Sequence, residues 1–124
     1  MKTSQSKNYG MELIIDLHAC DLGKNVSKKR TEEFIVEVCS MTKMKRHGRP
    51  LWWTQKSEIP FWHGTSVLQF IVTSDIVMHL LPKMRCVYIN IFTCKPFQPK
   101  PVVEYAKKFW KAGKVATSKL VIRK

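Results

Sequence analysis

The sequence predicts an α+β fold, a two-layer sandwich in which helices pack on one face of a mainly antiparallel β-sheet. Short apolar runs rich in Val, Ile and Leu recur along the chain, and two stretches between them have helical spacing instead. Hydrophobic residues make up 44% of the sequence, which suffices for a core and exceeds what a disordered chain contains. With a length of 124 residues, the segment 1–124 is expected to form a single domain.

The N-terminal third predicts a strand, a turn and a helix. The run MELIIDLHAC, residues 11–20, alternates loosely and is rich in Ile and Leu, which is typical of a strand. DLGKN, residues 21–25, has the composition of a turn. A helix should begin near Ser27 or Thr31 and end before Gly48. Its apolar positions recur at helical spacing and are Phe34, Ile35, Val38 and Cys39.

Aromatic residues are concentrated in the segment LWWTQKSEIPFWHG, residues 51–64, which holds three of the four tryptophans. Its first part, LWWTQ, predicts a strand, and the rest predicts a loop that displays Phe61, Trp62 and His63. Aromatic side chains in a loop either cover the core as a lid or form a stacking platform for a flat ligand. The residues by themselves favour the lid.

The C-terminal half predicts three strands, a helix and a last strand. The three strands are expected at 66–73, 75–81 and 86–93. Three prolines then indicate a stiff connector, namely Pro96, Pro99 and Pro101. The amphipathic run 102–113 predicts a helix that stops at Gly113, and 114–124 predicts the final strand.

Strand parity separates a core face from a face that can line a site. Val87, Ile89 and Ile91 alternate and form the natural core face, so the opposite face carries Cys94. The same parity places His79 away from the core. This arrangement would let His79 and Cys94 meet across two neighbouring strands.

Charge and composition restrict the function classes. The formal net charge of +13 suits either an anionic partner such as nucleic acid or a merely soluble surface, and the scattered basic residues leave both open. The four cysteines and four histidines lack the spacing of zinc or HExxH sites, so no metal site is expected. Glu12 and Asp16 interrupt the early apolar run, and no apolar stretch reaches the roughly 20 residues of a membrane span. A cytoplasmic protein with free thiols is therefore expected.

One constellation resembles a known family. The segment GTSVLQFIVTSDIVMHLLP followed by INIFTC is similar to the prokaryotic S-adenosylmethionine decarboxylases, which are small pyruvoyl-dependent enzymes. The family's Gly-x-Ser, Glu-Ser-His, His and Phe-Thr-Cys motifs match without gaps at Ser66, Ser74, His79 and Cys94. YGMELIIDLHACD also resembles the family's opening strand, and the likeness covers most of residues 9–115.

The resemblance implies a self-made cofactor. Ser74 would attack the carbonyl carbon of Thr73, cleave the Thr73–Ser74 bond and become a pyruvoyl group that forms a Schiff base with the substrate. Ser66 and His79 match residues that assist this processing, and Cys94 matches the residue that returns a proton to the substrate α-carbon. The implied product is decarboxylated S-adenosylmethionine for spermidine synthesis. The family also implies a homodimer, packed sheet edge to sheet edge with active sites near the interface.

The implied substrate-binding positions are Phe61, Trp62 and Lys83. The two aromatics lie about where the family stacks adenine, a contact worth about 1–3 kcal/mol per base in nucleic-acid systems. Lys83 stands where the family has a glutamate that binds the ribose hydroxyls, and a lysine offers only donors and would repel a sulfonium. Further departures from the family pattern are Thr73 for Glu, Asp75 for His and Leu81 for Trp.

Two alternatives therefore remain beside S-adenosylmethionine decarboxylation. One is a pyruvoyl-dependent arginine or ornithine decarboxylase of the same family, which would keep the cleavage machinery and change the nucleoside pocket. The other is a non-catalytic basic module that binds nucleic acid. The retention of four polar residues at family spacing argues against that module.

Overall fold

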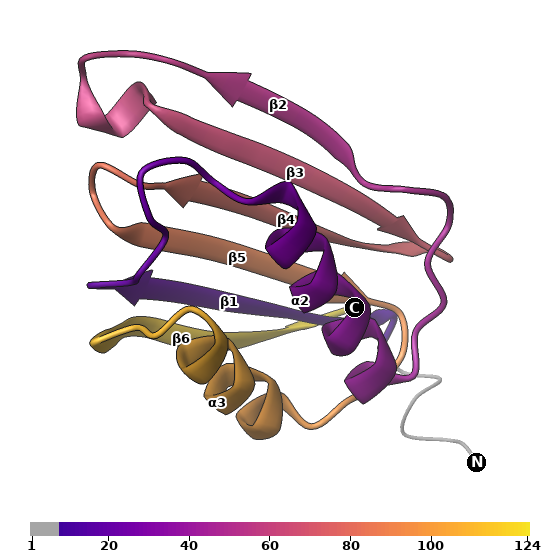
Figure 1. Ribbon diagram of the computed structural model, residues 1–124. Coiled ribbons are helices and arrows are strands. Elements are labelled where there is room, and N and C mark those ends of the chain that lie inside the picture. Colours follow the sequence, from indigo (N-terminus) through magenta and orange to yellow (C-terminus); the bar gives the residue numbers. More distant parts are fainter. Residues whose placement is uncertain (1–7) are drawn as a thin grey trace.

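A computed structural model describes residues 8–124 as one six-stranded antiparallel sheet with two α-helices (Figure 1). The strands are β1 (Gly10–His18), β2 (Leu51–Gln55), β3 (Gly64–Ile71), β4 (Ser74–Leu81), β5 (Cys86–Thr93) and β6 (Lys114–Arg123). The helices are α2 (Lys28–Thr42), α3 (Pro99–Phe109) and the short 3₁₀ helix η1 (Pro60–Trp62). The strand order is β2-β3-β4-β5-β1-β6, with every neighbouring pair antiparallel.

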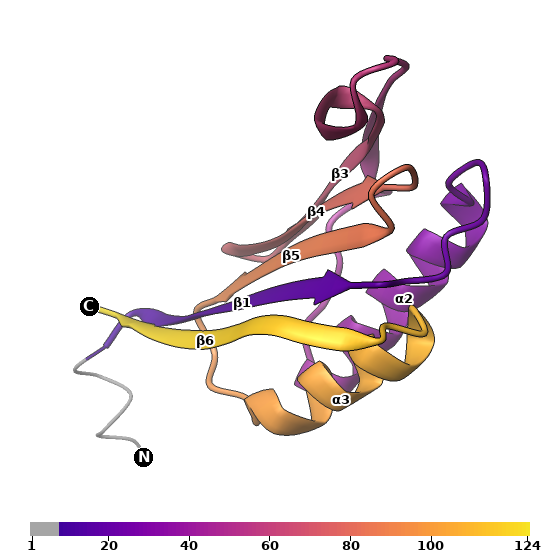
Figure 2. The ribbon, with the colours of Figure 1, turned by 90° about the vertical axis from the view of Figure 1, so that its left-hand side faces the viewer.

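Both α-helices cover the same face of the sheet, as the edge-on view shows (Figure 2). Alternate residues of the four central strands point toward these helices, and Ile15, Ile76 and Ile89 are fully buried there. Helix α2 adds Phe34 and Val38 to this core, and α3 adds residues one helical turn apart. The predicted two-layer α+β sandwich is thus confirmed.

The ends of α2 follow the chemistry of its flanking residues. The Ser27 hydroxyl accepts a hydrogen bond from the Arg30 backbone N–H at 3.1 Å, which makes Ser27 the N-cap. At the other end Lys43 adopts the left-handed conformation that closes many helices, with φ of 57°. Of the two predicted starts, Ser27 and Thr31, the structure shows the one at Ser27.

Helix α3 begins three residues earlier than the periodicity of 102–113 predicts. Pro99 and Pro101, expected in a stiff connector, form its first turn instead. Proline is tolerated there because the first N–H groups of a helix have no partner within the helix. No helix within residues 8–124 is both long and apolar enough to cross a membrane.

The hairpin between β3 and β4 has a loop of only two residues, Val72 and Thr73. Ile71 pairs with Ser74 at its base, so β3 ends two residues before the predicted boundary and β4 begins one residue earlier. This turn fixes the register of the whole hairpin, because residue partners in an antiparallel pair follow directly from the loop length.

Candidate active site

Ser74 lies directly after the two-residue turn, beside the end of β5. Its hydroxyl oxygen accepts a hydrogen bond from the backbone N–H of Cys94 at 3.0 Å, and the residue is buried. The Thr73 hydroxyl donates to the Cys94 sulfur, also at 3.0 Å. Thr73, Ser74 and Cys94 therefore form one contact group, which joins a hydroxyl, a thiol and the peptide bond between Thr73 and Ser74.

Thr73 has an unfavourable backbone conformation. Its φ is 53°, in the left-handed region that a β-branched residue rarely adopts. A residue held there stores about 1–3 kcal/mol, which the surrounding structure must compensate. Tight hairpin turns with positive φ ordinarily carry Gly or Asn. The strained residue is therefore the one that supplies the carbonyl group of the Thr73–Ser74 peptide bond.

A cavity of about 500 Å³ surrounds this turn, and we call it the hairpin cavity. Burial raises the pKa of the Asp75 carboxyl within it, and the negative charge of Glu12 adds to that shift. Phe70 and Phe92 supply aromatic walls. The complete lining is His47, Phe70, Ile71, Val72, Thr73, Ser74, Asp75 and Phe92.

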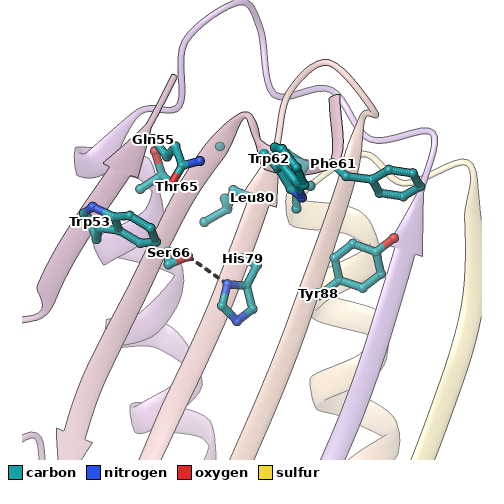
Figure 3. A pocket seen from close by; sticks show the side chains of 11 residues that line it. Trp53, Gln55, Phe61, Trp62, Thr65, Ser66, His79, Leu80 and Tyr88 are labelled. Atoms are coloured by element: carbon teal, nitrogen blue, oxygen red, sulfur yellow. Dashed lines mark hydrogen bonds between the residues drawn. The ribbon is translucent and has the colours of Figure 1, made fainter. Parts of the chain in front are cut away.

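A second polar pair lies at the other end of β4. Ser66 on β3 and His79 on β4 are register partners, and the Ser66 hydroxyl lies 2.8 Å from Nδ1 of His79 (Figure 3). Both side chains point to the sheet face that α2 and α3 leave uncovered, as the parity of His79 predicts. A serine hydroxyl that is hydrogen-bonded to an imidazole forms a pair that can accept or donate a proton.

This pair opens into a cavity of about 560 Å³, which we call the aromatic cavity. Phe61 and Trp62 reach it from η1, and both side chains are well exposed. Trp53 on β2 and Tyr88 on β5 flank His79 from either side (Figure 3). The complete lining is Trp53, Gln55, Phe61, Trp62, Gly64, Thr65, Ser66, His79, Leu80, Leu81 and Tyr88.

Comparison with known proteins shows which family the chain belongs to. The family model described as S-adenosylmethionine decarboxylase matches residues 11–122, which is most of the chain. The chain belongs to the S-adenosylmethionine decarboxylase family. The fold is also similar to the crystal structure of the adenosylmethionine decarboxylase from Aquifex aeolicus VF5, with a TM-score of 0.73. The two sequences are 13% identical, and the match covers 94% of this chain and 91% of the other. No curated protein matches the sequence.

Family membership makes this chain a decarboxylase. The structure corrects one prediction about its polar residues: His79 and Cys94 do not meet within one chain. The β4–β5 register pairs His79 with Tyr88 and Asp75 with Phe92, so the residue next to Cys94 is Thr73. His79 lies five residues after Ser74 on the same strand, a span of about 17 Å at 3.3–3.4 Å per residue. Parity placed His79 correctly on the uncovered face, but Ser74 belongs to the buried set of β4, and the turn length determined the separation of the two residues.

Lys83 lies outside the lining of the aromatic cavity. Its ammonium donates a hydrogen bond to the Ser57 carbonyl oxygen at 2.8 Å. Ser57 also donates its backbone N–H to His63, at the end of the loop that carries Phe61 and Trp62. Lys83 thus ties the turn after β4 to the loop of the aromatic residues.

The sequence did not single out Trp53 and Tyr88 as site residues. Trp53 belongs to a strand whose alternation is weak, and only its pairing with Ser66 shows that it faces the aromatic cavity. Tyr88 shares its strand parity with Cys94, a signal that could have found it. No group of three or more potential metal ligands occurs within residues 8–124.

The four free thiols differ in access. Burial raises the pKa of Cys20 to about 11, with a further contribution from Cys86, and burial alone raises that of Cys39 to about 11. Cys86 is also buried, whereas Cys94 is partly exposed beside the turn. Cys94 is therefore the thiol most accessible to a reacting molecule.

Proposed function

We propose that this chain is the precursor of a pyruvoyl-dependent S-adenosylmethionine decarboxylase, in which Ser74 cleaves the bond that joins it to Thr73. The decarboxylated product would serve spermidine synthesis. One observation carries the proposal. In a member of this family, a strained Thr73 precedes a buried Ser74, and Cys94 contacts both residues. The residues at the turn therefore fit the formation of a pyruvoyl group.

Self-cleavage begins when the Ser74 oxygen bonds to the carbonyl carbon of Thr73 and its proton leaves. The peptide C–N bond then breaks, the nitrogen gains a proton, and an ester joins the two residues. Loss of the Ser74 α-proton breaks the Cβ–O bond and releases fragment 1–73 with a terminal carboxylate. Water then displaces the nitrogen as ammonia, and fragment 74–124 begins with a ketone.

The other assigned residues manage substrate and protons. A pyruvoyl ketone supplies an electron sink for the carbon–carbon bond that breaks as carbon dioxide leaves. We assign the return of a proton to the substrate α-carbon to Cys94, because its thiol is partly exposed and lies at the cleavage point. Ser66 and His79 are assigned to processing, as a hydrogen-bonded pair that can accept the Ser74 proton.

Two copies of the chain would bring these groups together. The aromatic cavity and the hairpin cavity lie at opposite ends of β4, and both include side chains of the uncovered sheet face. A second copy packed on that face, about a two-fold axis near Val77, would place the partner's Ser66 and His79 over the turn that precedes Ser74. Exposed apolar side chains on this face, Trp53 and Phe70 among them, support such a contact.

Packing through the sheet face accounts for a shared site better than packing through a sheet edge. Strand β4 lies two strands from the β2 edge and three from the β6 edge. Because neighbouring strands are about 4.8 Å apart, an edge contact would leave Ser74 roughly 10 Å or more from the partner. We therefore propose a homodimer that packs face to face, in place of the edge-to-edge dimer expected from the family resemblance.

The aromatic cavity favours a nucleoside substrate. Its lining contains four aromatic side chains and no carboxylate. Aromatic faces bind a flat base by stacking, whereas the guanidinium of arginine or the ammonium of ornithine needs an anionic partner. One observation supports the second candidate, a decarboxylase of basic amino acids: the Asp75 carboxyl lies in the hairpin cavity next to Ser74.

Intact-mass spectrometry of the purified protein tests the cleavage. We expect fragments 1–73 and 74–124, with the second fragment labelled by a carbonyl reagent. Ser74→Ala should remain one chain, and Cys94→Ala should cleave yet lose turnover. A wild-type protein that stays intact and unlabelled would refute the proposal.

Carbon dioxide release from S-adenosylmethionine, arginine and ornithine then identifies the substrate. Release from S-adenosylmethionine alone supports the first candidate, and release from a basic amino acid alone supports the second. Co-expression of His79→Ala and Ser74→Ala chains tests the shared site. The His79→Ala chain should be cleaved only when the partner supplies an intact His79, and cleavage of that chain on its own would contradict the face-to-face arrangement.

A further inference from the structure

We propose that Tyr9 is a further catalytic residue of self-cleavage, whose phenol stabilises the charge that develops on the Thr73 carbonyl oxygen. This inference rests on the proposed function of Ser74. The Tyr9 hydroxyl donates a hydrogen bond to that oxygen at 3.3 Å. Tyr9 and Thr73 are separated by 64 residues in sequence, so the contact is made by the fold and not by a local turn.

Two features hold the phenol at the carbonyl. The Tyr9 ring stacks on Phe92, with centroids 5.8 Å apart and planes 18° apart. The next residue, Gly10, lies so close to β5 that an added Cβ would be 1.9 Å from the Thr93 carbonyl oxygen. The absence of a side chain at Gly10 therefore allows β1 to start directly beside Thr93 and Cys94, which places Tyr9 over the turn.

Tyr9 donates its hydrogen bond to the carbonyl oxygen of Thr73, on which negative charge develops during cleavage. When Ser74 attacks, the carbonyl π electrons move to the Thr73 oxygen, which becomes an oxyanion until the C–N bond breaks. A neutral phenol that already donates to this oxygen polarises the carbonyl before attack and binds more strongly to the oxyanion. The proton stays on the phenol throughout, so Tyr9 needs no partner acid or base.

Tyr9 contacts a different atom of the reacting groups from the one that Cys94 contacts. Cys94 holds the attacking Ser74 oxygen through its backbone N–H, whereas Tyr9 holds the oxygen of the carbonyl under attack. Loss of one oxyanion donor typically slows an acyl-transfer step by about 100- to 1,000-fold, and the half-exposed position of Tyr9 reduces this to about 10- to 100-fold.

The test compares the rates of chain cleavage in pulse-labelled cell-free translation. Tyr9→Phe keeps the ring on Phe92 and removes only the hydroxyl, so we expect cleavage about 10- to 100-fold slower than wild type. Tyr9→Ala removes the ring as well. Tyr105→Phe is the matched control, because Tyr105 on α3 stacks on Phe34 of α2 and lies outside the hairpin cavity, and this variant should cleave at the wild-type rate.

The outcomes separate this inference from the proposed function. Slow cleavage in Tyr9→Phe, with an unchanged thermal midpoint in a Ser74→Ala background, supports a role for the hydroxyl. Cleavage of Tyr9→Phe within about twofold of wild type overturns the inference and leaves the Ser74 proposal intact, even if Tyr9→Ala is slow. A wild-type chain that never cleaves refutes the proposed function itself.

Discussion

Replacing Thr73 by glycine should stabilise the unprocessed fold and slow its cleavage. Thr73 has a φ of 53°, and a left-handed conformation costs an L-residue about 1–2 kcal/mol. Glycine removes that cost but gains about 0.5–1 kcal/mol of unfolded-state entropy. The difference is a net stabilisation of about 0.5–1 kcal/mol, opposite in sign to the usual effect of glycine in the middle of a strand.

Lys43 supplies a matched control for this change. It has a nearly identical φ of 57°, is exposed and lies at the end of α2, outside the lining of the hairpin cavity. Lys43→Gly should therefore gain similar stability without any effect on cleavage. Both stabilities are measured by urea denaturation in a Ser74→Ala background, where no chain is cut.

The cleavage rate shows whether the strain is used. If attack on the Thr73 carbonyl releases the strain, losing about 1–2 kcal/mol of it slows cleavage about 5- to 30-fold. Pulse-chase measurement of fragments 1–73 and 74–124 gives this rate. A Thr73→Gly chain that is more stable and still cleaves at the wild-type rate would show that the strain has no part in the reaction.

Three further predictions concern stability and thiol chemistry. Ser27→Ala should lower the free energy of unfolding by about 1 kcal/mol in urea denaturation, because α2 loses its capping oxygen, and Ser27→Asp should restore it. The pKa of Glu32 lies below its usual range because Arg46 and Arg49 both donate hydrogen bonds to its carboxylate. Its stabilising effect is therefore complete above the unfolded pKa of 4.5 and is lost as pH falls through the lower folded value, so Glu32→Gln should lose less stability than wild type on acidification. Iodoacetamide at about pH 8 should alkylate Cys94 before Cys20 or Cys39, and peptide mapping that finds the reverse order would contradict the assigned burial.

Strand and helix identities followed from the sequence because each has a local cause. The alternation of Val87, Ile89 and Ile91 is repeated in their burial, and the helical spacing around Phe34 marks the buried side of α2. The start of α3 was misplaced because proline reads as a helix breaker, whereas the first turn accepts it. These signals operate within one element, so a single sequence contains them.

The candidate site was less predictable, because its geometry depends on pairing between elements. The family spacing identified Ser74 and Cys94, and they do meet at the turn. No sequence pattern pointed to Tyr9, because its contact with Thr73 depends on how closely β1 approaches β5. The separation of His79 from Cys94 depended on the two-residue loop, a register that alternation alone does not reveal.

Lys83 illustrates how a departure from a family pattern can be understood from its contacts. In the sequence it was the most serious departure, because an ammonium in place of a carboxylate would repel a cationic substrate. The Lys83 ammonium instead donates to the Ser57 carbonyl, and a carboxylate at this position could not make that bond. The positively charged ammonium of Lys83 therefore lies against the backbone of the loop before η1, and Lys83 is absent from the lining of the aromatic cavity. Since this loop carries Phe61 and Trp62, the lysine fits a role in positioning the aromatic side chains, and its presence is compatible with a sulfonium substrate.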